Sequence, residues 1–364
     1  MRIVHIITKC DYGGAQTVLA ELASEQQRRG HDVSVIAGLT GPVSEDLTRL
    51  GISVEHEPTL THAVHLRNDR SAFRALSSRL EKTKPDIVHT HSSKGGLLGR
   101  AAARRLDIPV VYTAHGWPFQ HGAAARQRVQ SFAGEWFSAR GAGPVVCVST
   151  SDFELAVSSR VCRRSDLYLV HNGVGRPGDC AVDSLKASHS DGLRLVMVAR
   201  FSRPKRQDLV IEALKMLPPD ISVTFVGDGE LLLPNQTLAR DLENRVRFAG
   251  VADPRPFLRA ADAFVLVSDY EGLSISVIEA MRAGLPIIAN ELPGLRDAVV
   301  NGTTGLLCTS TPASLATAIE SLRDPRRRAL LGNAARRVWE ERFTVTAMTD
   351  GYDEVYRSAL VPRS

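Results

Sequence analysis

The sequence predicts an α/β protein of two doubly wound, parallel-sheet domains. Short apolar runs alternate with amphipathic helical patterns along the chain, and this alternation lapses once, over residues 175–192, before it starts again. A chain of 364 residues also exceeds the size at which one hydrophobic core usually stops growing, which favours two domains of roughly 170 residues each. Alternating strands and helices imply mostly parallel sheets covered on both faces.

The first half opens with a βαβ unit. A strand over residues 2–7 leads through a loop with Gly13 and Gly14 into a helix over residues 17–27, and a second strand follows over residues 32–37. Further apolar runs predict a helix and three strands, which are the helix 95–105 and the strands 86–89, 109–113 and 144–148. Residues 1–174 are therefore the first predicted domain, and it is Rossmann-like.

The second half repeats this plan after the polar segment 175–192, which is predicted to be a linker. Its apolar runs predict a helix and five strands, which are the helix 207–217 and the strands 193–198, 222–226, 246–248, 263–267 and 285–289. Residues 193–343 are the second predicted Rossmann-like domain. In such sheets ligands bind at the carboxyl ends of the strands, so we expect the active site in a deep cleft between the two domains.

Composition narrows the class of protein further. Hydrophobic residues make up 43% of the chain and charged residues 23%, which excludes a disordered chain, and no apolar run is long enough to span a bilayer. The first residues do not resemble a signal peptide, and five cysteines without C-x-x-C spacing suit reduced thiols, so we expect a cytoplasmic protein. Residues 360–364 resemble the remnant of an added protease site and carry no functional argument.

The net charge of +5 is concentrated in the first half. Residues 1–175 contain 21 Lys and Arg against 16 Asp and Glu, and residues 88–140 contain seven basic residues against two acidic ones. This basic region indicates either solvated helix faces or attraction to an anionic partner, such as the inner face of a membrane or a phosphorylated acceptor. No nucleic-acid-binding motif accompanies the charge, so we expect no nucleic-acid partner.

The segment Asp269–Gly284, DYEGLSISVIEAMRAG, places two carboxylates around a predicted helix start. Glu271 lies in the loop after a buried strand, Ser274 is the expected N-cap, and Glu279 lies one and a half turns into the helix. The free N–H groups of a helix N-terminus attract anions, phosphate above all. The two glutamates therefore suit sugar hydroxyls on either side of a phosphate, although they could also be solvated charges.

Two cations and a histidine follow other predicted strands. Arg200 and Lys205 lie in the loop after the strand 193–198, which together with the helix start suggests a diphosphate site. His115 follows the strand 109–113 and is placed to hydrogen-bond a ligand, with a packing role as the alternative. A zinc site formed by His89, His91 and His115 is a further alternative, which the missing Cys or carboxylate at ligand spacing disfavours.

Together these residues resemble the retaining GT-B glycosyltransferases of the family-4 type, which use nucleotide-diphosphate sugars. The motifs that carry the resemblance span nearly the whole chain, and they are Gly13-Gly14, His115-Gly116, Asn172-Gly173-Val174, Arg200 with Lys205, Gly227-Asp228-Gly229, and Glu271 and Glu279. The stretch from His91 to Phe119 is similar, more narrowly, to bacterial enzymes that extend polysaccharide units on polyprenyl-diphosphate lipids. In this family the last helix, here about residues 344–359, crosses back to the first domain.

The resemblance implies a role for each candidate residue in the nucleotide-sugar-binding second domain. Arg200, Lys205 and the backbone of Gly272, Leu273 and Ser274 would bind the donor diphosphate, and Glu279 would bind the ribose. Glu271 would contact the transferred sugar, and Gly227 and Val251 would lie near the base.

In the acceptor-binding first domain, His115 would hydrogen-bond the sugar near its reacting face, with Glu271 as its catalytic counterpart. Gly14 and Lys94 would lie near the phosphate or the acceptor. No metal or other cofactor is implied, because the cations and the helix dipole stabilise the leaving charge. Retention of anomeric configuration is expected, with the leaving diphosphate accepting the acceptor's proton.

The acceptor implied by this resemblance is a saccharide linked to a polyprenyl diphosphate, in cell-surface polysaccharide assembly. A small-molecule natural product is the alternative acceptor.

 Two further readings stay open: an epimerase acting on a nucleotide sugar, and a non-catalytic protein that binds anions or a membrane surface through the basic region.

Overall fold

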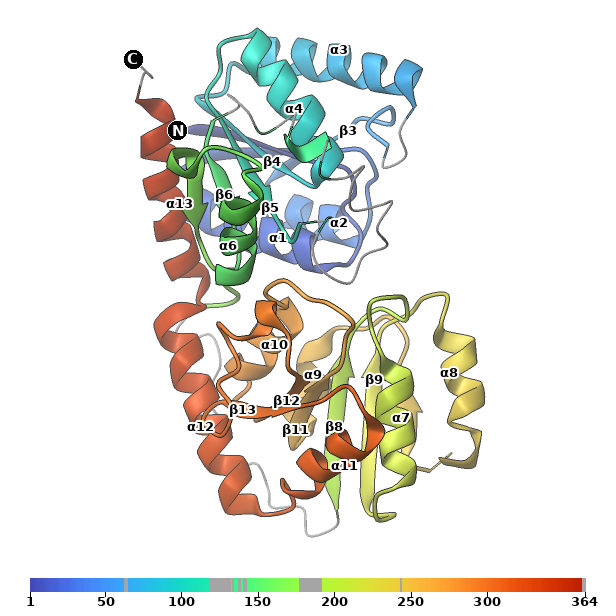
Figure 1. Ribbon diagram of the computed structural model, residues 1–364. Coiled ribbons are helices and arrows are strands. Elements are labelled where there is room, and N and C mark those ends of the chain that lie inside the picture. The colour runs from blue at the N-terminus through green and yellow to red at the C-terminus, as the bar shows by residue number, and fades with distance from the viewer. Residues whose placement is uncertain are drawn as a thin grey trace. The chain divides into compact units, whose positions relative to one another are not determined.

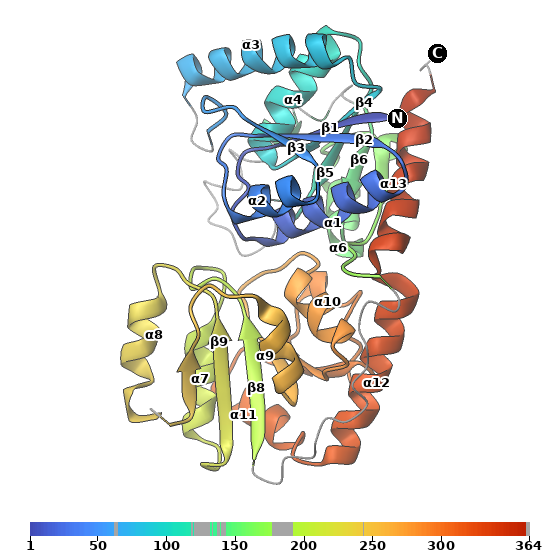
Figure 2. The ribbon, with the colours of Figure 1, turned by 180° about the vertical axis from the view of Figure 1, so that it is seen from behind.

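The structure is a computed structural model that describes residues 1–61, 65–117, 119, 132, 134–136, 139, 143–176, 192–242 and 244–361. The chain divides into two compact units, which Figures 1 and 2 show from opposite sides. The first unit contains Met1–Gly173 and Val345–Ser364, and the second contains Val174–Thr344. Each unit has one parallel sheet with helices packed on it, so the predicted α/β class is confirmed.

The first unit is built on a seven-stranded parallel sheet in the order β3-β2-β1-β4-β5-β6-β7. Its strands are β1 Arg2–Ile7, β2 Asp32–Ala37, β3 Ser53–His56, β4 Ile87–His91, β5 Val110–Ala114, β6 Val145–Cys147 and β7 Leu167–Leu169. Its helices are α1 Gly14–Arg28, α2 Pro42–Arg49, α3 Leu66–Thr83, α4 Ser93–Arg105, α6 Thr150–Ser159 and α13 Val345–Leu360.

Alternation along the strands divides the core of the first unit into two layers. Val4 and Ile6 of β1 pack with residues of α3 and α4 on one face of the sheet. On the other face, Ile7 and Val35 pack with Leu19 of α1 and with α2. Because successive strand residues point to opposite faces, His5 points to the α1 side of the sheet.

Helix α13 comes from the end of the chain but belongs to the first unit, where it lies along α1 and β5. Arg29, just after α1, forms ion pairs of 2.8 Å with both Asp350 and Asp353 of α13. Tyr352 and Tyr356, one helical turn apart, are fully buried in this packing. A helix from the far end of the chain therefore packs against the sheet of the first unit.

The second unit is built on a six-stranded parallel sheet in the order β10-β9-β8-β11-β12-β13. Its strands are β8 Leu193–Val198, β9 Ile221–Val226, β10 Val246–Phe248, β11 Ala263–Leu266, β12 Ile287–Asn290 and β13 Gly305–Cys308. Its helices are α7 Gln207–Lys215, α8 Leu232–Leu238, α9 Pro254–Ala260, α10 Ile275–Arg282, α11 Pro312–Glu320 and α12 Pro325–Arg342.

Side-chain caps and proline begin several helices of the second unit. Asp253, Thr311 and Asp324 each accept a hydrogen bond from a backbone N–H in the first turn of α9, α11 and α12, and a proline follows each of them. These groups satisfy donors that a helix start otherwise leaves free. The local sequence therefore fixes where these helices begin.

Three strands that the apolar pattern did not predict lie at sheet edges. They are β3 and β7 in the first sheet and β13 in the second. Each has only three or four residues, and β3 has no fully buried residue. An edge strand packs against one neighbour only, so its sequence carries a weaker apolar run than a central strand.

None of the helices in the described part of the chain is long and apolar enough to cross a membrane. Cys10, Cys147, Cys162 and Cys308 are free and buried, and Cys180 lies outside the described residues.

Close packing of α12 on the end of α10 yields a stability prediction at Gly332. A Cβ atom at this position would lie 2.3 Å from the carbonyl oxygen of Gly284. Glycine to alanine in a helix interior ordinarily stabilises by about 1 kcal/mol, but overpacking costs about 1–3 kcal/mol. We expect Gly332→Ala to lower the free energy of unfolding by about 1–2 kcal/mol in urea titrations.

The matched control is Asn333→Ala, at the exposed neighbouring position of α12. It should change the free energy of unfolding by no more than about 0.5 kcal/mol. A Gly332→Ala protein as stable as the wild type would show that α12 does not need this close approach.

Candidate active site

Loops at the carboxyl ends of β8 and β11 are joined in the second unit. The backbone N–H of Arg206 donates to the oxygen of Val267 (2.9 Å), and that of Asp269 donates to the oxygen of Pro204 (2.8 Å). Lys205 and Ser268 form an antiparallel bridge between these hydrogen bonds. The predicted cation loop and the predicted carboxylate loop are therefore held side by side.

Lys205 and Glu271, which the sequence predicts for the diphosphate and the sugar, form an ion pair through Lys205 Nζ and Glu271 Oε1. Ser268 Oγ donates a hydrogen bond to the same carboxylate oxygen (2.6 Å). The Lys205 and Glu271 side chains are only 18% and 12% exposed. Partial burial strengthens such a pair relative to one in open solvent, so each side chain is held in place by the other.

Asn290 at the end of β12 fixes Ser268 in turn. Its Nδ2 donates to the Ser268 oxygen (2.8 Å), and its Oδ1 accepts from the Ser268 N–H (3.0 Å). Both residues are buried. Neither was predicted from the sequence, although both follow predicted strands at the edge where ligands bind.

Helix α10 begins where the sequence predicts, with Ser274 as its N-cap in an extended conformation. The Ser274 side chain makes no capping hydrogen bond, and its Oγ lies 3.1 Å from that of Ser276. The first-turn N–H groups are therefore not capped by this side chain, which leaves them suited to an anion. Gly272 and Leu273 precede the cap, and Glu279 lies half-buried in the second turn.

Gly227 and Gly229, after β9, pass against the loop after β8. A Cβ atom on Gly227 would lie 2.2 Å from the Ala199 oxygen, and both glycines have positive φ angles. Gly227 N–H donates to the Gly250 oxygen (2.8 Å), and this places the loop beside Val251, which is 59% exposed. The residues predicted near the base thus share one edge of the sheet with the cation loop.

Arg200 is exposed and lies in the same loop as Lys205. Within the described part of the chain its guanidinium has no hydrogen-bond or ion-pair partner. Its five donors are therefore available to an anion, in contrast to the paired ammonium of Lys205.

The remaining predicted residues, Gly14, Lys94 and His115, lie in the first unit. Gly14 is the first residue of α1, and Lys94 lies in the first turn of α4. Lys94 is buried and its Nζ lies 2.6 Å from Asp69 Oδ1. A phosphate at Lys94 would have to share or displace this carboxylate.

The basic region 88–140 is only partly a charged surface. Arg100 is 1% exposed, with its guanidinium over the Tyr112 ring and 3.7 Å from Glu135. With Lys94 also buried, two of the seven basic residues do not contribute free surface charge. Arg126, Arg128 and Arg140 lie outside the described residues.

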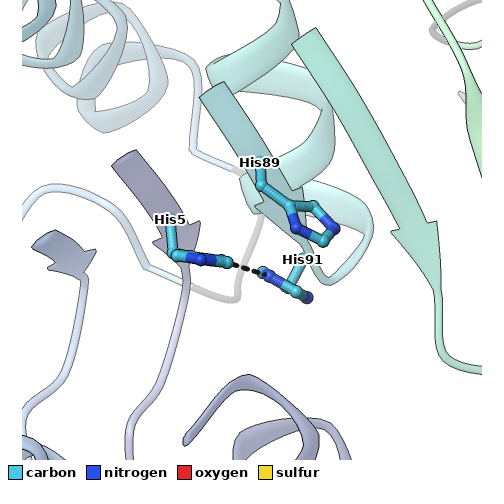
Figure 3. A group of neighbouring side chains, drawn as sticks. All are labelled: His5, His89 and His91. Carbon is cyan, nitrogen blue, oxygen red and sulfur yellow. Dashed lines mark hydrogen bonds between the residues drawn. The ribbon is translucent and has the colours of Figure 1, made fainter. Parts of the chain in front are cut away.

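A row of buried histidines crosses the centre of the first sheet. His5 of β1 is paired in register with His89 of β4, and His91 follows two residues later on the same face. Figure 3 shows His5 and His91 joined by a hydrogen bond, with His89 beside them. His91 Nδ1 is also 2.9 Å from His115 Nε2, so His115 ends the row.

Polar partners surround these imidazoles. His5 Nε2 is hydrogen-bonded to Gln26 Oε1 (2.8 Å) of α1. His89 is hydrogen-bonded through Nδ1 to the Tyr356 hydroxyl and through Nε2 to the Thr113 hydroxyl, both at 2.7 Å. Gln26, His5 and Tyr356 were not predicted from the sequence, although His5 alternates with apolar residues in a predicted strand.

Hydrogen bonding also bears on the zinc alternative. His5, His89 and His91 lie close enough together to hold a metal ion. Both ring nitrogens of each are already hydrogen-bonded, however. A zinc ion would need lone pairs that these bonds use, so the arrangement favours a hydrogen-bonded cluster.

Burial keeps these rings neutral. Desolvation lowers the pKa of His5 and that of His115 to about 4. Desolvation, and then the neighbouring histidines, lower the pKa values of His89 and His91 well below their usual range. All four rings are therefore neutral imidazoles at pH 7, each with one N–H and one lone pair.

Two family models match the chain. The Glycosyltransferase Family 4 model matches residues 12–175, and the model for glycosyl transferases group 1 matches residues 186–338. The putative glycosyltransferase EpsD of Bacillus subtilis (strain 168) is 31% identical over 309 residues, which span 78% of this chain and 80% of EpsD. The chain belongs to the glycosyltransferases.

Other relatives of this glycosyltransferase extend the comparison. The UDP-Gal:alpha-D-GlcNAc-diphosphoundecaprenol alpha-1,3-galactosyltransferase of Escherichia coli is 29% identical over 328 residues, 84% of each chain. The structure of HepE from Anabaena in complex with UDP-glucose has a TM-score of 0.84 at 22% identity and covers 98% of this chain and 100% of HepE. WaaG, a glycosyltransferase involved in lipopolysaccharide biosynthesis, has a TM-score of 0.76 at 16% identity, covering 97% and 99%. The predicted GT-B fold is confirmed.

The neutral histidine row predicts how the stability of this glycosyltransferase depends on pH. In the unfolded chain these imidazoles take up protons near pH 6.5, whereas in the folded protein they stay neutral to about pH 4. Between about pH 6.5 and pH 4 the unfolded state therefore binds more protons than the folded state, so the free energy of unfolding falls as the pH falls. Each additional proton gives a slope of about 1.4 kcal/mol per pH unit.

Urea unfolding between pH 7 and pH 5 measures this slope. His5→Gln should reduce this slope by about 1.4 kcal/mol per pH unit, the value for one proton, because the variant has one buried imidazole fewer. His65→Asn, which changes an exposed histidine, should leave the slope as in the wild type. Equal slopes for the wild type and His5→Gln would contradict the prediction.

Proposed function

We propose that this glycosyltransferase moves a sugar from a nucleotide-diphosphate sugar to a lipid-linked saccharide, with retention of anomeric configuration, in cell-surface polysaccharide assembly. The observation that carries the donor class is the joined loop edge of the second unit, where Lys205 pairs with Glu271. The loop of Lys205 also holds Arg200, and the loop of Glu271 leads into the start of α10. Two cations and a helix N-terminus suit a diphosphate, and the carboxylate suits sugar hydroxyls.

Retention follows from a step in which the acceptor approaches from the side that the diphosphate leaves. The bond between the anomeric carbon and the diphosphate oxygen breaks, and a bond from that carbon to the acceptor oxygen forms on the same face. The acceptor's hydroxyl proton passes to the leaving diphosphate oxygen. The negative charge that develops on the diphosphate is stabilised by Arg200, Lys205 and the N–H groups of α10. These groups supply the stabilisation without a metal ion.

Other contacts of the donor are assigned from the family resemblance. Glu279 would bind the ribose, Gly227 and Val251 would lie near the base, and His115 would hydrogen-bond the sugar. Gly14 and Lys94 would lie near the phosphate or acceptor, with the Lys94–Asp69 ion pair opening when an anion binds.

Relatives support the choice of substrates. One of them is named for transfer of galactose from UDP-Gal to a GlcNAc-diphosphoundecaprenol, and HepE is described in complex with UDP-glucose. A diphosphate-linked lipid acceptor would bring the protein to the inner face of the cell membrane. Exposed Arg104 and Arg105 of α4 are available for such a surface, whereas buried Arg100 is not.

Nucleotide binding tests the donor site. We expect calorimetry with UDP, GDP, ADP and dTDP to detect binding of at least one nucleotide, and Lys205→Ala to weaken that binding at least tenfold, because a charge-assisted hydrogen bond is worth about 1.5–3 kcal/mol. Glu271→Gln should leave nucleotide binding unchanged and lower the rate of sugar transfer.

Lys215→Ala is the matched control, since Lys215 lies in α7 of the same unit and pairs with Glu212 near the surface. It should bind nucleotide as the wild type does. No binding of any of the four nucleotides would contradict the proposed donor class, and full transfer activity in Glu271→Gln would contradict the role of Glu271.

Mass analysis of lipid-linked oligosaccharides in a strain lacking this protein tests the acceptor. We expect a lipid-linked intermediate one sugar short of the wild-type product, restored by the wild-type gene but not by Glu271→Gln. An unchanged lipid-linked pool together with loss of a glycosylated small molecule would instead establish the natural-product alternative. Transfer that needs no second sugar or other acceptor would indicate an epimerase.

A further inference from the structure

The histidine row of the first unit forms a hydrogen-bonded chain that begins at Gln26 and ends at His115. Gln26 Oε1 lies 2.8 Å from His5 Nε2, His5 Nδ1 lies 3.1 Å from His91 Nε2, and His91 Nδ1 lies 2.9 Å from His115 Nε2. Figure 3 shows the central link, with His5 on β1 and His91 on β4. Four residues from four parts of the fold are thus joined end to end.

This chain has a direction because each neutral imidazole has one N–H and one lone pair. Gln26 Oε1 can only accept a hydrogen bond, so His5 carries its proton on Nε2. His5 Nδ1 therefore has the lone pair and accepts a hydrogen bond. His91 must then donate from Nε2 to His5, which leaves His91 Nδ1 as an acceptor. By the same step, His115 donates from Nε2 to His91.

The last atom of the chain, His115 Nδ1, therefore carries a lone pair. It is buried, and it has no hydrogen-bond partner among the described residues. Buried polar atoms are nearly always hydrogen-bonded, and one that is not calls for a ligand or a water molecule. An acceptor in this position fits a group that donates a hydrogen bond, such as a sugar hydroxyl.

Tyr356 of α13 holds the amide of Gln26 in the required orientation. Gln26 Nε2 donates to the Tyr356 hydroxyl oxygen (2.9 Å), which directs Oε1 toward His5. The Tyr356 hydroxyl is also hydrogen-bonded to His89 Nδ1 (2.7 Å). Turning the amide over would place its NH2 group against His5 Nε2–H and its oxygen against the Tyr356 hydroxyl oxygen. The chain could therefore reverse only if the His5 tautomer and the Tyr356 hydroxyl proton changed with it.

We propose that Gln26 is a positioning residue which, through His5 and His91, holds His115 in the Nε2–H tautomer, so that His115 Nδ1 accepts a hydrogen bond from a hydroxyl of the substrate. The identification of that hydroxyl as one on the transferred sugar rests on the proposed function. The tautomer itself depends only on the hydrogen bonds within the first unit.

Long-range proton–nitrogen correlation spectra of the full chain, labelled with isotope-enriched histidine and free of ligand, test the tautomer. We expect His5, His91 and His115 to be neutral and protonated on Nε2. In Gln26→Met, which keeps the side-chain length but removes the acceptor, protonation on Nδ1 should appear at His115. Gln27→Met, at the next position of α1, should give the wild-type spectrum. An Nδ1–H or doubly protonated His115 in the wild type would overturn the proposal.

Transfer kinetics test the consequence for the substrate. Gln26→Met should lower kcat about tenfold or more, the size expected when a buried hydrogen bond is replaced by a mismatched pair, while the Kd for nucleoside diphosphate changes less than about twofold. Gln27→Met should match the wild type in both. Unchanged kcat in Gln26→Met with an altered His115 tautomer would overturn the link to the substrate.

Failure of the proposed function is distinguishable from failure of this inference. A wild-type protein that binds no nucleotide and transfers no sugar contradicts the function and leaves the spectra as the test of the tautomer. A wild-type protein that transfers sugar but shows the opposite tautomer contradicts the role of Gln26 alone.

Discussion

Hydrogen bonding between parallel strands is the constraint on which both units depend. All strand pairs in the two sheets are parallel, so every strand in a unit ends at the same edge. In the second unit this edge gathers the loops after β8, β9 and β11, and main-chain hydrogen bonds then join them. The ion pair of Lys205 and Glu271 forms between two of these joined loops, those after β8 and β11.

One face of the sheet in the first unit has a polar interior, which consists of histidines joined by hydrogen bonds. Four neutral imidazoles replace apolar side chains there, and desolvation would be costly if their nitrogens lacked partners. Gln26, Thr113, Tyr356 of α13 and the neighbouring imidazoles supply those partners, and Tyr352 of α13 is hydrogen-bonded to Thr113. Among the described residues, His115 Nδ1 is the nitrogen of this row that has no hydrogen-bond partner, and it lies at the end of the row.

Local sequence predicted the parts of the molecule that depend on neighbouring residues. The α/β class, most central strands and the start of α10 at Ser274 follow from apolar runs and capping chemistry, and the structure confirms them. The histidine network could not be predicted in this way, because it needs strand register and a helix from the other end of the chain. Gln26 and Tyr356 are 330 residues apart, and only folding brings them to 2.9 Å. Lys94 and Arg100 count as basic residues in the sequence, yet their burial depends on packing with Asp69 and Tyr112.

The position of α13 has a consequence for synthesis on the ribosome. Residues 1–173 emerge first, but Tyr352 and Tyr356 emerge only after the whole second unit has been made. Until then His89 and Gln26 lack the Tyr356 hydroxyl, and the amino-terminal sheet cannot reach its final stability. A nascent chain of this protein therefore carries an unfinished domain throughout translation, and chaperones or proteases can act on it until its last helix arrives.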